Sequence, residues 1–274
     1  MRNVLPALAL VVPALVACGG TDPKVGFDST AAMTLLERQV ALGPRPAGSE
    51  ASRRLSEILR DLLPEGRFQD VPGGLRNVVG TVEGRDVDRL VVVGAHYDTK
   101  DLPGFVGAHD GASGTAVVTE LARTIRPREL DPTVVFVLFD GEESPRRSDD
   151  FERDGMRGSR VAARTLEDAE AMVLLDFVGD RDLAIPREAH SDVELWARLR
   201  AAAQRAGHSE HFPAGTARGM VDDHIQFSAL GVPAIDLIDS GFDCFHRPCD
   251  DLSAVSERSL DVVGETVLEL LRGM

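Results

Sequence analysis

The sequence has too few basic residues, and too little clustering among them, for a protein that binds nucleic acid. Its 30 Lys and Arg residues stand against 45 Asp and Glu, which gives a formal net charge of -15. Nucleic-acid binding requires clustered Lys and Arg to neutralise phosphates, so no nucleic-acid partner is expected. The acidic balance is compatible with a cationic ligand, such as a free amino group, and equally with a surface that only serves solubility.

The sequence also offers no apolar run near its start that is long enough to cross a bilayer. Residues 4–16 are apolar and follow Arg2, which predicts a signal peptide over residues 1–17. The run ends in LVAC at Cys18 and resembles the lipobox at which bacterial lipoproteins are cut and acylated. We expect residues 18–28 to be a polar tether and the protein to be exported. A lipidated Cys18 would hold it on the outer face of the cytoplasmic membrane or in the cell envelope. The alternative, an ordinary signal peptide ending near a cysteine, predicts export too.

Cysteine is scarce, and only Cys244 and Cys249 remain beside Cys18. Export would let these two residues form a disulfide across a short loop that contains His246. Such a bond would either stiffen the backbone around His246 or act as a purely structural staple. Two cysteines and one histidine at this spacing do not resemble a structural zinc knuckle.

Internal repeats and low-complexity linkers are absent, so we expect one domain over residues 29–274. The chain has 274 residues, of which 43% are apolar, and is long enough to bury a substantial core. Two helices are predicted first, one capped by Ser29 or Thr30 and one over residues 50–63 that Pro64 ends. Short apolar runs then alternate with helical patterns, which predicts an α/β fold with a largely parallel sheet.

Five apolar runs are the strand candidates, and their near-continuous apolarity indicates burial on both faces. They are NVVGTV around Val78, LVVVG from Leu90, TVVFVLF from Thr133, MVLLDFV from Met172 and PAIDLI from Pro233. Further helices are predicted over residues 114–125, 193–205 and 257–271, the second with Trp196 as a packing residue. The charged stretch 144–157 is predicted to be a surface loop near the site.

Side chains able to bind a metal follow the carboxyl ends of several strand candidates. They are His96, Asp98, Asp140, Glu142, Glu143, Asp176 and His246, and Asp110 stands in the turn before the helix at residue 114. Open parallel sheets place ligands beyond the carboxyl ends of their strands, so we expect these side chains to converge in one crevice. Burying so many charged groups is costly without a compensating cation.

Mixed carboxylate and imidazole ligands suit zinc, and three protein ligands leave one coordination position open. The neighbouring residues Glu142 and Glu143 point in different directions at a strand end, so one can bind the metal while the other moves protons. A glutamate beside a metal and other acids also has its pKa displaced toward the range in which a general base works.

The motifs GAHYDT, GAHDGASG, FDGEE, GSR, LLDFVGD, VDDHIQF and FHRPCDD occur in that order, with GPRPAGS upstream. Together they resemble the family-28 metallopeptidases, which include zinc aminopeptidases and animal-type glutaminyl cyclases. The resemblance runs from about Gly43 to the C-terminus. It implies a zinc-exopeptidase fold, a three-layer sandwich whose mixed, mainly parallel central sheet is flanked by helices.

The resemblance also implies the roles of individual residues. Asp110, Glu143 and His246 match the positions that hold the first zinc, and Glu142 matches the residue that transfers protons.

In the aminopeptidases of the family a second zinc is implied. His96 and Asp176 match the positions that complete its site, with Asp110 bridging the two ions. The cyclases hold one zinc, and there the position of Asp176 belongs to a carboxylate network with that of Asp222 and the catalytic glutamate.

Local features favour the cyclase branch, namely Lys100 after HYDT, the segment GFVGAHD and the DDH of VDDHIQF. Other features depart from it. Asp236 stands where animal cyclases have a histidine, and Phe245 stands where they have a tryptophan, while GASG resembles the peptidases.

We therefore expect a zinc enzyme that acts on the N-termini of peptides or proteins, with one zinc ion or two. The favoured activity is glutaminyl-peptide cyclotransferase, which converts N-terminal glutamine to pyroglutamate and releases ammonia. The alternatives are a zinc aminopeptidase and a binding module without catalysis. The other five histidines are interpreted as surface or capping residues without a ligand role, namely His109, His190, His208, His211 and His224. A supporting role near the site is left open for His224.

Overall fold

The computed structural model describes Met1 and residues 26–274. The predicted signal peptide, Cys18 and most of the predicted tether lie outside these residues, so export and lipidation stay predictions. Within the described part, no helix has the length and apolarity that a membrane span requires. Phe27 is buried, and its backbone N–H donates to Glu265 Oε1 at 2.7 Å. The packed part of the chain therefore includes residues just before the predicted start at residue 29.

The described strands form one mixed sheet in the order β1-β2-β4-β3-β5-β6. They are β1 (Arg67–Val71), β2 (Leu75–Val82), β3 (Asp86–His96), β4 (Pro132–Phe139), β5 (Ala171–Asp176) and β6 (Ala234–Ile238). The last four run parallel to one another, whereas β2 is antiparallel to both β1 and β4. The predicted mainly parallel sheet is confirmed. β1 was not predicted, because its sequence RFQDV is polar and largely exposed at the sheet edge.

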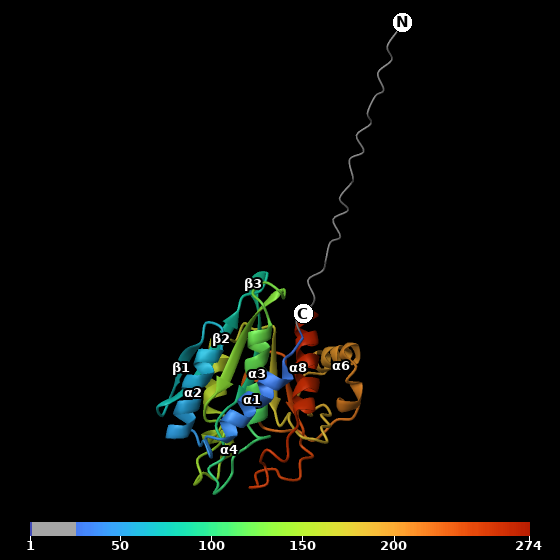
Figure 1. Ribbon diagram of the computed structural model, residues 1–274. Coiled ribbons are helices and arrows are strands. Elements are labelled where there is room, and N and C mark those ends of the chain that lie inside the picture. The colour runs from blue at the N-terminus through green and yellow to red at the C-terminus, as the bar shows by residue number, and fades with distance from the viewer. Residues whose placement is uncertain (2–25) are drawn as a thin grey trace.

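Helices cover both faces of the sheet and complete a three-layer sandwich (Figure 1). One face carries α1 (Ser29–Val40), α2 (Glu50–Leu62), α3 (Ala112–Thr124), α6 (Val193–Ala206) and α8 (Glu257–Arg272), which share one hydrophobic cluster with the strands. The other face carries α5 (Arg157–Thr165) and α7 (His224–Ser228). Two short elements remain, the single turn α4 (Phe151–Asp154) inside the predicted surface loop and η1 (Ser209–His211).

Strand β4 shows why the predicted strands are apolar along their whole length. Alternate side chains of a strand point to opposite faces of the sheet, and both faces are covered by helices here. Val134, Phe136 and Leu138 belong to the cluster under α1 and α3, and Val135, Val137 and Phe139 belong to the cluster under α5 and α7.

The N-cap of α1 differs from the prediction. Asp28, rather than Ser29 or Thr30, accepts a hydrogen bond from the backbone N–H of Ala31 at 2.9 Å. The hydroxyl groups of Ser29 and Thr30 instead donate to Glu257 Oε1 at the start of α8. The carboxylate reaches the free N–H groups at the helix N-terminus one residue earlier, which leaves both hydroxyls free to bind α8.

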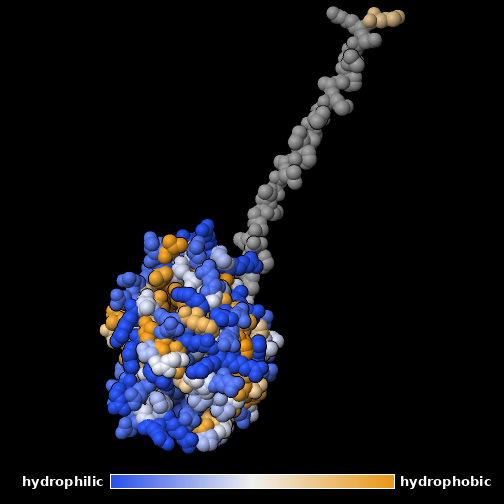
Figure 2. Space-filling view, turned by 90° about the vertical axis from the view of Figure 1, so that its left-hand side faces the viewer, coloured by the Kyte–Doolittle hydropathy of each residue, from blue (hydrophilic) through white to orange (hydrophobic). Residues whose placement is uncertain are grey.

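Charged and polar side chains cover most of the face seen in Figure 2, in agreement with the acidic composition. A few large apolar side chains are exposed on the described surface, and one of them is Val221, which is 37% exposed. The loops after the parallel strands gather at one end of the molecule, at the bottom of Figure 1. The predicted site residues follow these strands, and Val221 lines the same cavity as they do.

Candidate metal and substrate site

Asp98, which follows β3, fixes the turn that carries the two glutamates after β4. Its Oδ1 accepts from the backbone N–H groups of Gly141 at 3.0 Å and Glu142 at 3.2 Å, and its Oδ2 accepts from that of Glu143 at 3.2 Å. Gly141 has a φ of +78°, which glycine adopts without steric cost. Because Asp98 is fully buried, these bonds determine where both glutamate side chains point.

The loop that carries Asp110 is held from two sides. Asp250 accepts from the backbone N–H of Asp110 at 3.1 Å and from that of the preceding residue at 2.7 Å. Arg45 is fully buried and donates to the carbonyl oxygens of Val106 at 2.9 Å and Gly107 at 3.3 Å. The motifs GPRPAGS and FHRPCDD, which supply Arg45 and Asp250, thus position Asp110. Neither residue was predicted for the site.

Asp110, Glu143 and His246, here called the outer triad, meet at the cavity. His246 Nε2 lies 3.4 Å from Asp110 Oδ2 and 3.5 Å from Glu143 Oε1, and the three potential ligand atoms lie within 4.8 Å of one another. Both carboxylate oxygens are buried and have no hydrogen-bond partner. Buried polar atoms normally have partners, so two unpaired oxygens beside an imidazole nitrogen fit a metal cation.

Lys100 binds the second carboxylate oxygen of Glu143. Its ammonium group donates to Glu143 Oε2 at 2.6 Å, which leaves Oε1 for the centre of the outer triad. Burial and the nearby Asp110 raise the pKa of Glu143 to about 7, and Lys100 and His246 limit the rise. Burial alone would also raise the pKa of Asp110, but its contacts with His246 and His96 hold that pKa below its usual range.

His96, Asp110 and Asp176, here called the inner triad, lie behind the outer one and share Asp110 with it. His96 Nε2 lies 3.2 Å from Asp110 Oδ1 and 3.2 Å from Asp176 Oδ1, while Nδ1 lies 3.1 Å from the carbonyl oxygen of Asp98. Burial lowers the pKa of His96, but the carboxylates of Asp176, Asp110 and Asp98 outweigh it and raise the pKa well above its usual value. His96 thus contacts both carboxylates of the inner triad, whose potential ligand atoms also lie within 4.8 Å of one another.

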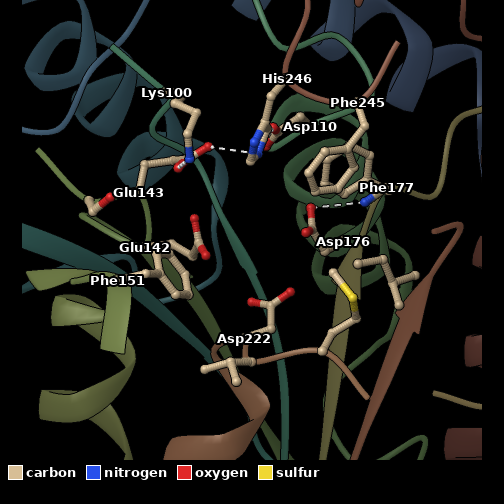
Figure 3. A pocket seen from close by; sticks show the side chains of 14 residues that line it. Lys100, Asp110, Glu142, Glu143, Phe151, Asp176, Phe177, Asp222, Phe245 and His246 are labelled. Carbon is tan, nitrogen blue, oxygen red and sulfur yellow. Dashed lines mark hydrogen bonds and ion pairs between the residues drawn. The ribbon is translucent and has the colours of Figure 1, made fainter. Parts of the chain in front are cut away.

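The site opens into a cavity of about 270 Å³ (Figure 3). Its lining residues are Lys100, Asp110, Glu142, Glu143, Ser144, Phe151, Asp176, Phe177, Met220, Val221, Asp222, Ile238, Phe245 and His246. In Figure 3 the carboxylates of Glu142 and Asp222 face each other across the space below the outer triad. Burial, and then repulsion from Glu143, raise the pKa of Glu142 well above its usual range.

His246 is held in an unusual backbone conformation by its surroundings. It has a φ of +53°, which is rare for a residue with a side chain, and it lies in the loop closed by a disulfide between Cys244 and Cys249. The Phe245 ring lies 4.1 Å from the imidazole and stacks on Phe177 at 4.8 Å, measured between ring centroids. The disulfide, which the sequence allowed but left open, is thus present, and residues of its loop line the site.

The structure brings together the predicted metal ligands and the predicted catalytic residues. Asp140 does not line the cavity, and its Oδ2 accepts instead from the backbone N–H of Arg76 at 3.1 Å. The structure also corrects two of the other histidines. His109 and His224 are fully buried rather than at the surface. His109 Nδ1 accepts from the backbone N–H of Gly179 at 2.9 Å, and His224 Nε2 lies 3.3 Å from Glu188 Oε2. Phe151, whose side chain lines the cavity, lies in the predicted loop and was not predicted individually.

Fold and site together define a chain of the zinc-exopeptidase type, and comparison with known families agrees. The model of Peptidase family M28 matches residues 77–271. The chain therefore belongs to peptidase family M28, which confirms the resemblance found in the motifs.

Three relatives illustrate the range of this similarity. The chain is 28% identical over 247 residues to a glutaminyl-peptide cyclotransferase of Gloydius blomhoffii, a match that covers 73% of this chain and 65% of the relative. It is 25% identical over 210 residues to the aminopeptidase YwaD of Bacillus subtilis (strain 168), covering 70% of this chain and 43% of the relative. Among solved structures, an Acidobacteriales bacterium glutaminyl cyclase superposes with a TM-score of 0.79 at 28% identity, covering 98% of each chain. The chain thus spans about 65% of the curated cyclotransferase.

Proposed function

We propose that this protein is a zinc-dependent glutaminyl-peptide cyclotransferase, which closes the N-terminal glutamine of a peptide or protein to pyroglutamate and releases ammonia. The observation that carries the proposal is the contrast between the triads. The outer triad has two buried, unpaired carboxylate oxygens, whereas the inner triad is already paired through His96. This contrast supports a single zinc ion in the outer triad, the number held by the cyclases that the motifs resemble.

Asp110, Glu143 and His246 would hold this zinc, which when bound polarises the side-chain amide carbonyl of the glutamine. Glu142 would then do the proton transfers. Its carboxylate takes a proton from the α-amino nitrogen as that nitrogen bonds to the amide carbon. It returns the proton to the amide nitrogen as the carbon–nitrogen bond breaks and ammonia leaves. The raised pKa of Glu142 suits a group that must both accept and donate a proton.

Asp176 and Asp222 would orient the amide nitrogen of the substrate. Both carboxylates line the cavity with Glu142, and a carboxylate oxygen accepts a hydrogen bond from an amide N–H. The rings of Phe151, Phe177 and Phe245 form apolar walls that exclude water from the reacting groups. Exclusion of water favours attack by the substrate's own amine over hydrolysis.

The second candidate is a zinc aminopeptidase with one or two zinc ions. It is favoured by Asp110, whose two oxygens face the two triads as a bridging ligand would, and by the potential ligand atoms of His96, Asp110 and Asp176 lying within 4.8 Å of one another. A water molecule would then attack the first peptide bond, with Glu142 again handling the proton. A binding module without catalysis is not favoured, because the full set of ionisable groups is in place. Export and a lipidated Cys18 remain part of the proposal.

Mass spectrometry of a peptide with N-terminal glutamine separates these functions. We expect a loss of the mass of ammonia with no free amino acid released. If free glutamine accumulates instead, the protein is an aminopeptidase and the cyclase assignment is wrong.

The control variant is Glu142→Gln, which keeps the size of the side chain and removes the proton acceptor. Turnover should fall about 10²–10⁴-fold, the usual contribution of a general base, while zinc content stays at the parent level. Loss of zinc from this variant would show that Glu142, and not Glu143, is the ligand.

A further inference from the structure

We propose that a groove beside the cavity binds the residues that follow the reacting N-terminal residue, so that the substrates are polypeptides with an extended N-terminal segment. The Val221 groove, as it is called here, is lined by Glu152, Met156, Arg160, His190, Val221, Ile225, Gln226 and Ser228. The inference rests on the proposed function, because it takes the reacting residue to lie in the cavity. It adds a second binding region that selects substrates by length.

Val221 connects the cavity to the groove. Its side chain lines both spaces, and it also lines a third hollow over Phe151, which itself borders the cavity. Val221 is 37% exposed, unusual for a large apolar side chain of this protein. A peptide whose first residue occupies the cavity passes over Val221 as it leaves, and its next residues then lie in the groove.

The sizes of the two spaces agree with this division. The cavity holds about 270 Å³ and the groove about 590 Å³. Small-molecule sites in proteins usually measure roughly 300–1,000 Å³. The cavity is at the lower limit of that range and suits a single residue, whereas the groove has room for several. Apolar side chains from Val221 and Ile225 line the groove together with polar ones from His190 and Gln226, a mixture that suits a peptide.

The walls of the groove are fixed before any ligand arrives. Arg160 in α5 donates to the carbonyl oxygen of Glu152 in α4 at 2.8 Å, which ties these two helices together. Gln226 Nε2 contacts the sulfur of Met156 at 3.5 Å, which ties α7 to the start of α5. A preformed surface loses little conformational entropy on binding, so even a shallow groove can contribute to affinity.

Glu188 secures the remaining side of the groove. This fully buried carboxylate accepts from the backbone N–H groups of His190 at 2.8 Å and Met220 at 2.8 Å. His190 Nδ1 in turn lies 3.0 Å from the carbonyl oxygen of Met220, and His224 lies 3.3 Å from Glu188 Oε2. Glu188 and His224, which the proposed reaction does not use, thus hold the segment that supplies both Val221 and Asp222.

Kinetics on two substrates test the groove, namely a dipeptide and a hexapeptide that both begin with glutamine. In the parent protein kcat/KM should be about tenfold higher for the hexapeptide, equivalent to about 1.4 kcal/mol. Ser228→Arg and Ile225→Arg, which fill the groove, should abolish this advantage and leave the dipeptide unaffected. The matched control is Ala229→Arg, because Ala229 is the exposed neighbour of Ser228 and does not line the groove.

A second experiment measures the Kd of the same peptides for the Glu142→Gln variant, which does not turn them over. The measurement is repeated after Ser228→Arg or Ala229→Arg is added to this variant. A lower Kd for the hexapeptide that only Ser228→Arg removes supports the groove, even if the parent shows no cyclase activity and the proposed function fails. Equal Kd and equal kcat/KM for both lengths overturn the groove while the cyclase assignment stands. If neither peptide binds, both are wrong.

Discussion

The outer and inner triads share Asp110 and yet differ in how their charges are balanced. In the outer triad two carboxylate oxygens face a histidine without a hydrogen-bond partner, and His246 is 29% exposed. In the inner triad His96 is fully enclosed and lies 3.2 Å from each of two carboxylate oxygens. Burying a charge is costly unless it is paired, so the unpaired oxygens of the outer triad favour a cation there.

This difference teaches that an identical set of residue types does not imply identical metal binding. Both triads contain two acids and one histidine within 4.8 Å. The carboxylates around His96 raise its pKa, and a protonated imidazole offers no free lone pair to a metal at Nε2. The number of zinc ions thus depends on the protonation of His96, which residue composition does not reveal.

The largest expected difference is in zinc affinity, between a variant that lacks one residue of the outer triad and a variant that lacks one residue of the inner triad. Glu143→Ala is expected to weaken zinc binding more than 100-fold, since even residues that only support a metal ligand usually contribute about 10–100-fold. His96→Ala removes only a contact to the ligand Asp110 and should weaken zinc binding about tenfold. Competition with a chromogenic chelator measures both, and metal analysis of the parent should give one zinc per chain.

Comparable losses of zinc affinity in the two variants, together with two zinc ions in the parent, would contradict the assigned difference between the triads. The inner triad would then be a metal site, and the aminopeptidase assignment would replace the cyclase.

Opening the disulfide should affect the outer triad alone. Replacing Cys244 and Cys249 by serine removes a short covalent loop, which lowers the free energy of unfolding by about 2 kcal/mol. Because His246 lies in this loop with a φ of +53°, its position loosens, and zinc affinity should fall about tenfold. Asp243→Ser, an exposed change directly before this loop that keeps the disulfide, is the control. Unchanged zinc affinity in the serine variant would make the disulfide a purely structural staple.

The smallest expected effect is on the pH dependence of the free energy of unfolding, to which His109 and His96 contribute with opposite sign. Burial lowers the pKa of His109 from 6.5 to about 3, so the unfolded chain binds the extra proton between these values. Stability therefore falls as the pH drops below 6.5, and His109 contributes about 2 kcal/mol to this loss near pH 5. In His109→Gln the metal-free protein should lose less stability between pH 6.5 and 5, as measured by urea unfolding with a chelator present.

His96 should behave with the opposite sign. Its raised pKa stabilises the folded protein below pH 6.5, and this contribution disappears as the pH rises through the folded-state value. His96→Ala should therefore lose more stability at pH 5 than at high pH. An identical pH dependence of unfolding in the parent and both variants would contradict the assigned protonation states.

Periodicity predicted five of the six described strands within a few residues, because burial on both faces leaves near-continuous apolar runs. It did not predict the edge strand β1, whose polar sequence carries no such signal. The single turn α4 and the short helix α7 were also not predicted, because elements of four or five residues are too short to show a helical period.

The sequence by itself determined which side chains follow the strand ends, and hence that Asp110, Glu143 and His246 could meet. Covalent order is enough for this, since parallel strands deliver their carboxyl ends to one edge. Only the tertiary structure decided which of the buried charges are paired. The contacts that decide it, such as Asp250 with the Asp110 loop and Lys100 with Glu143, join residues far apart in the chain. Their balance depends on distances of a few ångströms in a low-dielectric interior, which no local pattern encodes.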